Sequence, residues 1–420
     1  MLITRAFFLM VCLVVASCAT APSVEPLPLP MATSPESVGL SSEQLANIEI
    51  VTARHIESGM LPGAVMLVAR KGRVAWFKTM GYRDRASGDP MKPDSIFRMY
   101  SMTKPIVTVA AMMLVEEGRL ALDDPVSKYL PEMAGMKVGT EKVDASGTPM
   151  LELVTPEREM KILDLMRHTS GLIYAGRSKT LLNDAYTKAG ILKREFDNRE
   201  QVTRIATLPL RFSPGSRWEY GISTDVLGRI VEVIEGESLG RVLERRIFTP
   251  LDMRDTAFFV APEKLARAAQ PAQRPGGAPM TVRFDVAQKP AFESAGAGLA
   301  STMRDYLRFA TMLAKGGELD GKRILRRETV ATMTRDHLGN TPGIGEGRGF
   351  GFGVEVRKAP GEPGKTGLVG EYGWSGNAGT IFFVDPKREL IGIYLIQVSD
   401  EDRIALRNEF RSLVHGAVID

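Results

Sequence analysis

Strand-like segments lie near both ends of this chain, and a long helical stretch lies between them. Apolar runs of β-type occur at five places: 64–69, 74–78, 350–357, 380–384 and 390–397. The first two are separated by Lys71-Gly72, which is a hairpin pattern. From about residue 156 to residue 258 the apolar spacing is helical instead. This order favours one α/β domain, assembled from both ends of the chain, with a mainly helical insertion.

The boundaries that follow are residues 36–155 and 290–420 for the α/β domain and 156–289 for the insertion. Helical spacing also predicts helices over 41–57 and 401–418. Ligand sites tend to lie in the crevice between two such units. We therefore expect the functional residues at the junction of the domain and the insertion.

Composition excludes several classes of protein. The chain has 420 residues, of which 44% are hydrophobic and 25% charged, as is usual for globular proteins. A chain of this length buries enough surface to need no disulfide or metal for its core. Lys and Arg exceed Asp and Glu by only four (54 against 50), and we find no basic run, so nucleic acid is not an expected partner.

Both cysteines, Cys12 and Cys18, lie in the first eighteen residues. The body of the chain therefore offers no thiol nucleophile and no thiolate ligand. The apolar run before Cys18 is too short to span a membrane and reads as a signal peptide over residues 1–17. Val15-Ala16-Ser17-Cys18 resembles a bacterial lipobox, which implies a lipid on Cys18. A plain secretory leader is the alternative.

We accordingly predict an exported protein, either an outer-membrane lipoprotein or a periplasmic one. The Pro-rich stretch that follows Cys18 predicts an extended tether over residues 18–35. The lipid anchor would make the membrane a partner of the chain.

Several familiar catalytic motifs are absent from the sequence. We find no His-Glu-x-x-His, Gly-x-Gly-x-x-Gly or Gly-x-Ser-x-Gly pattern. The four histidines, His55, His168, His337 and His415, have no context that favours a catalytic triad or a metal site. No metal and no organic cofactor is predicted.

One motif does carry chemistry, namely Ser101-Met-Thr-Lys104 at the start of a helix-like run. Residues three apart share a helix face, so the lysine amine can reach the serine hydroxyl. A lysine desolvated in a cleft can have its pKa lowered enough to accept the serine proton. By itself the pattern is also compatible with a helix-capping serine and a solvated lysine.

Two further segments support this chemistry. Tyr220 lies on a loop that leads into a helix, where a phenol can share protons with an amine. Trp374, Ser375, Gly376 and Asn377 precede a strand, whose edge N–H groups can donate to an oxyanion. Taken singly, the tyrosine is compatible with a loop aromatic packed on the core, and the glycine-rich segment with an ordinary turn.

The three segments in this order resemble serine hydrolases of the penicillin-binding-protein and class C β-lactamase superfamily, with family VIII esterases the nearest group. Segments 165–172, 297–305 and 351–354 resemble that group as well, so the resemblance covers about residues 35–415. It implies an α/β fold with an antiparallel β-sheet flanked by helices and a mainly helical insertion.

The resemblance also implies roles for the motif residues. Ser101 would be the acylated nucleophile, Lys104 would accept its proton, and Tyr220 would take part in proton transfer. The backbone N–H groups of Ser101 and Asn377 would form the oxyanion hole, beside Trp374, Ser375 and Gly376. His168 lies in a matching segment and is assigned no chemistry.

Two departures bear on the substrate. The lactamases have an asparagine two residues after the motif tyrosine, where this chain has Ile222. They have Lys-Thr-Gly in the third motif, where this chain has Trp374-Ser375-Gly376. An indole in place of an ammonium favours neutral acyl groups over carboxylated substrates. A separate Lys-Thr-Gly triplet upstream contains Lys365. We interpret the match of this triplet to the lactamase motif as a coincidence. If its loop folds over the cleft, however, Lys365 would meet an anionic substrate.

The sequence thus predicts a serine hydrolase that cleaves short-chain carboxylic esters through an acyl-enzyme, with weak β-lactam hydrolysis as a side activity. The first alternative is a β-lactamase or D,D-peptidase acting on cell-wall peptides. The second is a non-catalytic outer-membrane scaffold. The expected partner is a small ester or lactam, and the sequence does not indicate an oligomeric state.

Overall fold

The computed structural model describes residues 26–271, 282, 285–362, 366–398 and 402–419. The signal peptide, Cys18 and Lys365 lie outside the described residues. Within the described ranges, none of the helices has both the length and the apolar character that crossing a bilayer requires.

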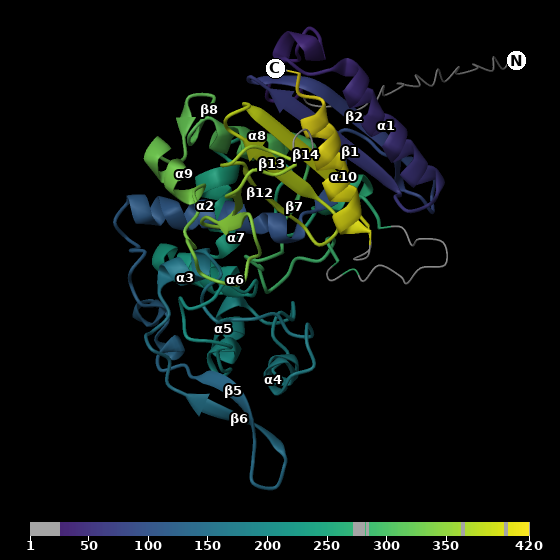
Figure 1. The fold of residues 1–420 in the computed structure, drawn as a ribbon. Helices are drawn as coiled ribbons and strands as arrows, with labels where there is room; N and C mark the ends of the chain where they lie inside the picture. The colour runs from purple at the N-terminus through teal and green to yellow at the C-terminus, as the bar shows by residue number, and fades with distance from the viewer. Residues whose placement is uncertain (1–25, 272–281, 283–284, 363–365, 399–401, 420) are drawn as a thin grey trace, which may run out of the picture.

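An eight-stranded antiparallel sheet forms the centre of the molecule (Figure 1). Its strands, in spatial order, are β10 (Arg348–Phe350), β11 (Glu355–Arg357), β12 (Tyr372–Ser375), β13 (Ile381–Asp385), β14 (Leu390–Ile396), β1 (Gly63–Arg70), β2 (Arg73–Asp84) and β3 (Asp89–Pro90). The pairing of β1 with β14 joins the two ends of the chain, with Ala64 opposite Ile396. The predicted fold class, an antiparallel sheet flanked by helices, is confirmed.

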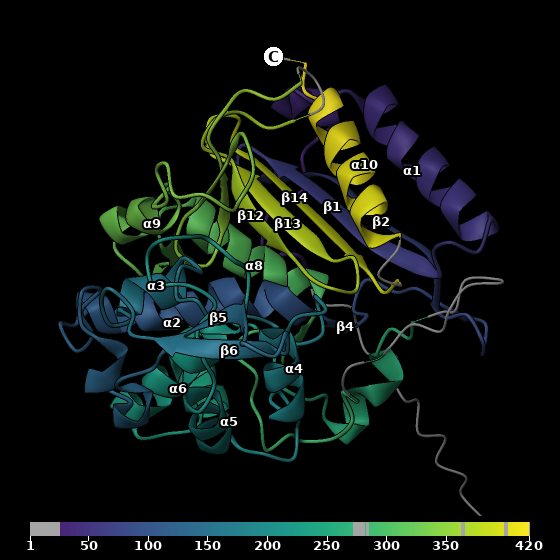
Figure 2. The same ribbon diagram turned by 60° about the horizontal axis from the view of Figure 1, so that its bottom comes forward.

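Both faces of the sheet are covered by helices, and its side chains alternate between them. Met66 and Phe383 point to the face covered by α1 (Ser42–Glu57) and α10 (Arg403–Gly416), which lie side by side in Figure 2. Leu67 and Phe382 belong to the other core, with α2 (Thr103–Glu116) and α8 (Met303–Ala314). Burial of both faces explains why β1, β13 and β14 read as unbroken apolar runs.

The helical segment packs against α2 on the side away from the sheet (Figure 1). Its elements are α3 (Ile162–Met166), α4 (Leu181–Lys188), α5 (Asn198–Ala206), α6 (Ser223–Glu235), α7 (Leu239–Leu243), the π-helix η5 (Glu244–Phe248) and the 3-10 helix η6 (Pro262–Arg267). The hairpin of β5 (Val138–Val143) and β6 (Pro149–Val154) packs against α4. It thus lies with the helical segment, although the predicted boundary falls after it, at residue 155.

Short elements complete the fold. They are the 3-10 helices η1 (Pro35–Val38), η2 (Tyr100–Met102), η3 (Val126–Lys128) and η4 (Pro131–Met133), the paired strands β4 (Phe97–Arg98) and β7 (Ala300–Ser301), the hairpin β8 (Glu318–Leu319) and β9 (Lys322–Arg323), and α9 (Arg327–Met333).

Two boundaries differ from the sequence prediction. The run 350–357 is not one strand, because Gly353 adopts φ +74° and turns the chain between β10 and β11. A side chain at Gly353 would also collide with Thr108. The segment predicted as a tether up to residue 35 already packs on the body, since Leu29 is buried and Ala32 N–H donates to Val74 O at 2.9 Å.

Candidate active site

Ser101 lies in the tight turn η2, just before α2 begins at Thr103. The sequence placed Ser101 at the start of the α-helix itself, whereas the observed position is two residues before that helix begins. Tyr100, the preceding residue, has φ +46°, a backbone conformation that non-glycine residues rarely adopt and that is often found at functional sites. Hydrogen bonds hold the turn: Met99 N–H donates to Leu299 O at 2.9 Å, and Tyr306 Oη donates to Met102 O at 2.9 Å.

Lys104 lies in the first turn of α2 and is fully buried. Its Nζ donates to the Gly296 carbonyl at 2.7 Å and to Tyr174 Oη at 3.0 Å. The same Nζ lies 4.8 Å from the centre of the Tyr220 ring. The structure therefore joins two of the three predicted catalytic side chains, Lys104 and Tyr220, and adds Tyr174 to them.

The acceptor carbonyl of Gly296 is itself held in place by Asp225 of α6. One carboxylate oxygen of Asp225 accepts from Gly296 N–H at 2.9 Å and from Ser294 Oγ at 2.7 Å. A Cβ at position 296 would collide with that carboxylate, so the close approach requires glycine. Asp225 thus fixes the loop that positions the lysine.

The protonation of Lys104 differs from the sequence argument. Burial is the largest influence and lowers the pKa of Lys104, as that argument expected. The neighbouring oxygens of Tyr174, Tyr220 and Asp225 act in the opposite direction and prevail, so the net pKa of Lys104 is raised. This net direction is opposite to the one that the sequence argument expected, in which desolvation lowers the pKa of Lys104.

Tyr220 is held by packing and not by its hydroxyl. Its ring lies edge-on to His168 at 4.8 Å and to Trp374 at 5.2 Å between ring centres. Its buried Oη has no hydrogen-bond partner among the described residues. An unsatisfied buried hydroxyl calls for an explanation, and a substrate or a water in the site is one. Burial, Lys104 and Arg177 keep the pKa of His168 well below its usual range, so this histidine is a neutral packing partner.

The third motif lies at the end of strand β12, beside the turn that carries Ser101. β12 ends at Ser375, and Gly376 follows with no room for a side chain, because a Cβ would collide with the Met99 carbonyl before the Ser101 turn. Ser375, Gly376 and Asn377 line one cavity with Ser101, and Trp374 packs between Tyr220 and Phe350. Ile222, by contrast, is fully buried in the core, so this position does not face the cavity.

The cavity beside Ser101 has a volume of about 560 Å³. Ser101, Tyr220 and all four predicted residues of the third motif line it, while Lys104 lies buried behind. Five arginines line it as well, namely Arg177, Arg194, Arg348, Arg403 and Arg407. The sequence analysis missed these arginines, Tyr174 and Asp225. Tyr174 follows the recognised segment 165–172 closely enough to be found, but the arginines come from separate segments that share no linear pattern.

One cluster elsewhere has the residue types of a metal site. The described residues Glu371, Asp385 and His415 are buried, with ligand atoms within 4.8 Å of one another. Cations already occupy their surroundings, because Arg411 pairs with Glu371 and Arg388 lies 3.2 Å from His415 Nδ1. The arrangement is that of a buried ion-pair network beneath α10 rather than a cation site.

Known proteins were compared with the whole chain. A family model described as beta-lactamase matches residues 51–415. Esterase EstB of Burkholderia gladioli is 34% identical over 380 residues, which cover 84% of this chain and 90% of EstB. Protein Rv1367c of Mycobacterium tuberculosis is 37% identical over 360 residues, covering 81% and 87%. The solved structure of EstCE1, a hydrolase with promiscuous acyltransferase activity, aligns with a TM-score of 0.73 at 27% identity, covering 89% and 99%.

These findings confirm the resemblance, the fold class and the prediction of an enzyme. They also favour ester cleavage over the non-catalytic scaffold. The chain belongs to the beta-lactamase family, and it is a serine hydrolase.

Proposed function

We propose that this hydrolase cleaves short-chain carboxylic esters through an acyl-enzyme on Ser101. The observation that carries the proposal is the free hydroxyl of Tyr220, which lines the same cavity as Ser101 and has the buried ammonium of Lys104 over its ring. A serine needs a nearby base to become nucleophilic, and Tyr220 offers an unengaged oxygen beside the Lys104 cation.

Because Tyr220 lines the cavity and Lys104 lies buried behind it, we assign the proton-accepting position to the Tyr220 oxygen. The Lys104–Tyr220 pair takes up the proton of the Ser101 hydroxyl at the Tyr220 oxygen while Ser101 Oγ bonds to the ester carbonyl carbon. Backbone N–H groups of Ser101 and Asn377 receive the carbonyl oxyanion. The C–O bond to the alcohol then breaks, and Tyr220 returns its proton to the departing oxygen. Water repeats the sequence on the acyl-enzyme.

The test compares p-nitrophenyl butyrate with nitrocefin on the full chain and on its Ser101→Ala variant. We expect the ester to turn over much faster than nitrocefin, and only with Ser101 present. Nitrocefin turnover equal to or above ester turnover would favour the β-lactamase or D,D-peptidase alternative. Ester turnover retained in Ser101→Ala would contradict the proposal.

A second candidate is transfer of the acyl group to an alcohol instead of water. The observation in its favour is the aromatic lining of the cavity, where Tyr174, Trp218, Tyr220 and Trp374 offer apolar surface to an organic acceptor. EstCE1 is described as having such activity. Product analysis in the presence of a primary alcohol would separate the two outcomes, since transfer yields a new ester and hydrolysis yields only the acid.

We further propose export with a lipid on Cys18, supported by the sequence pattern at residues 15–18. The Cys18→Ser variant should then move from the membrane fraction to the soluble fraction. An unchanged distribution would contradict the anchor.

A further inference from the structure

The cavity beside Ser101 has an unusual balance of charge. Five arginines line it, and Asp225 is the one described acid among its lining residues. Asp225 is already engaged with the Gly296 N–H and with Ser294. Arg348 is paired with Glu355, so the charges that bear on a ligand here are those of Arg177 and Arg407.

Arg177 belongs to the loop between α3 and α4. Its guanidinium lies 4.7 Å from the Tyr174 ring centre and 5.4 Å from the Tyr220 ring centre, and Nη1 donates to Tyr220 O at 3.5 Å. Arg407 belongs to α10, and its Nη1 donates to Gly376 O at 3.1 Å. Neither arginine forms an ion pair with a carboxylate in the described ranges of the chain.

Both guanidinium groups thus contact carbonyls of the segments that carry Tyr220 and the third motif, and both retain N–H donors. A guanidinium has five donors arranged to match a planar anion, whereas each of these contacts uses one. Arg407 is half-buried, and burial together with Arg403 lowers its pKa to about 10. Holding such a cation without a counter-ion is unfavourable unless a ligand supplies the negative charge.

We propose that the ester substrate carries a carboxylate, which Arg177 and Arg407 bind while Ser101 attacks the ester group. This inference rests on the proposed esterase function and narrows its substrate class. It also revises the expectation of neutral substrates, which considered the indole of Trp374 alone. The third motif has lost its ammonium, but the helical segment and α10 bring two guanidinium groups to the same cavity.

The test uses matched pairs of esters on the full chain. In the first pair, mono-p-nitrophenyl glutarate is compared with its methyl ester, which places the carboxylate on the acyl side. In the second, 4-butyryloxybenzoate is compared with its methyl ester, which places it on the leaving group. We expect kcat/KM to be about tenfold or more higher for the carboxylate in one of the two pairs, as for a charge-assisted hydrogen bond.

Variants then assign the preference to the arginines. Arg177→Gln and Arg407→Gln should each lower the ratio of carboxylate to methyl-ester kcat/KM by about tenfold, and Arg→Lys at either site should restore part of it. Arg241→Gln is the matched control, because Arg241 is 77% exposed and lines a different cavity. The exposed Arg177 keeps the test valid even if the Arg407 variant does not fold.

The outcomes distinguish failure of the carboxylate inference from failure of the proposed esterase function. If p-nitrophenyl butyrate is hydrolysed but neither carboxylate is preferred, the inference is wrong and the proposed function stands. A preference that survives both Arg→Gln substitutions also overturns it. If none of the esters reacts, the proposed function fails and the inference fails with it.

Discussion

Two cavities in the described part of the chain differ in size and charge, and the smaller one is lined by Ser101 and Tyr220. The larger cavity, about 1280 Å³, lies among α5, α6, α7 and residues 248–259. Its acidic and basic side chains are nearly equal in number. The acidic ones are Asp197, Glu232, Glu237, Glu244, Asp252 and Glu293, and the basic ones are Arg199, Arg229, Arg241, Arg254 and Lys289. The smaller cavity, about 560 Å³, has five arginines and one described acid.

The larger cavity satisfies many of its charges internally. Glu232 accepts from Asn198 Nδ2 at 2.9 Å and from Leu239 N–H at 3.0 Å, and Glu293 accepts from Gly240 N–H at 2.7 Å. The bonds of Glu232 join α6 to α5 and α7, and the bond of Glu293 joins a loop to α7, so both acids stabilise the packing of these segments. The comparison teaches that arginines without a carboxylate partner, here Arg177 and Arg407, and an unengaged hydroxyl indicate a site better than cavity volume does.

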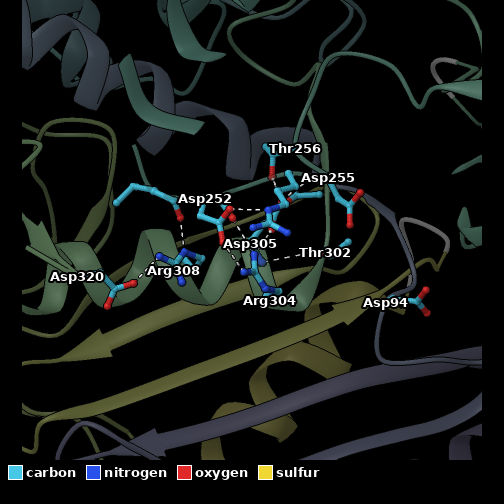
Figure 3. Close-up of polar contacts among 12 residues, drawn as sticks. Asp94, Asp252, Asp255, Thr256, Thr302, Arg304, Asp305, Arg308 and Asp320 are labelled. Carbon is cyan, nitrogen blue, oxygen red and sulfur yellow. Dashed lines mark hydrogen bonds and ion pairs between the residues drawn. The ribbon is translucent and has the colours of Figure 1, made fainter. Parts of the chain in front are cut away.

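The wall of the larger cavity continues into the polar network of Figure 3. There, Arg304 of α8 pairs with Asp252 at 2.6 Å, and Asp305 accepts from Thr256 Oγ1 at 2.9 Å and from Asp255 N–H at 2.7 Å. This network ties α8 to residues 252–256. We therefore expect substitutions on this side to change stability and those at the smaller cavity to change chemistry.

The largest expected effect on activity comes from comparing one serine of the smaller cavity with one serine of the larger cavity. Ser101→Ala should lower ester kcat/KM by about 10⁴-fold or more, because the nucleophile is lost. Ser238→Ala, in the wall of the larger cavity, should leave kcat/KM within about twofold, since the Ser238 side chain makes no capping hydrogen bond. Both are measured with p-nitrophenyl butyrate. Equal losses of kcat/KM in the two variants would contradict the assignment of the active site to the smaller cavity.

The second effect separates the two tyrosines that contact Lys104. Tyr220→Phe should lower kcat by about 10²–10⁴-fold, the range for one acid–base group. Tyr174→Phe removes one of the two hydrogen-bond partners of Lys104 Nζ, so we expect kcat to fall by about tenfold. Tyr186→Phe is the matched control, because its hydroxyl bonds to Pro209 O away from the cavity. A larger loss in Tyr174→Phe than in Tyr220→Phe would reverse the assigned roles.

The third prediction concerns Asp305, where we expect a change in stability and little change in activity. Burial raises the pKa of Asp305 to about 6. The unfolded chain titrates near the ordinary value, so the folded state favours the protonated carboxyl. Its contribution to stability is therefore full below about pH 4 and is lost as the pH rises through 6.

Urea unfolding at pH 4 and pH 7 checks this sign. The free energy of unfolding of the wild type should fall relative to Asp305→Asn by up to about 3 kcal/mol between the two pH values. Ester kcat/KM of the variant at neutral pH should stay within about threefold. Asp320→Asn is the control, since Asp320 pairs with Arg308 at the exposed end of the same network. A pH dependence identical in wild type and Asp305→Asn would rule out this role.

The sequence was most informative where a local pattern decides the structure. The runs at 64–69, 380–384 and 390–397 appear as β1, β13 and β14, because residues buried on both faces form continuous apolar strands. The spacing from Ser101 to Lys104 and the loop of Tyr220 were also visible as local patterns. The family resemblance then supplied their order.

What could not be predicted depends on residues far apart in the chain. The pKa of Lys104 depends on burial and on Tyr174, Tyr220 and Asp225, which lie far from Lys104 in the sequence. The arginines of the cavity come from segments as distant as Arg177 and Arg407. No periodicity or short motif reports which of many arginines the fold brings together, so Arg177 and Arg407 could not be predicted as neighbours.

The measurement that tests the central claim most directly is covalent trapping with a fluorophosphonate on the full chain. The label is located by peptide mass mapping in the wild type, in Ser101→Ala and in Ser238→Ala. We predict a single adduct on Ser101, absent from Ser101→Ala and unchanged in Ser238→Ala. An adduct on another serine, or labelling that persists in Ser101→Ala, would contradict the assignment of the smaller cavity as the active site.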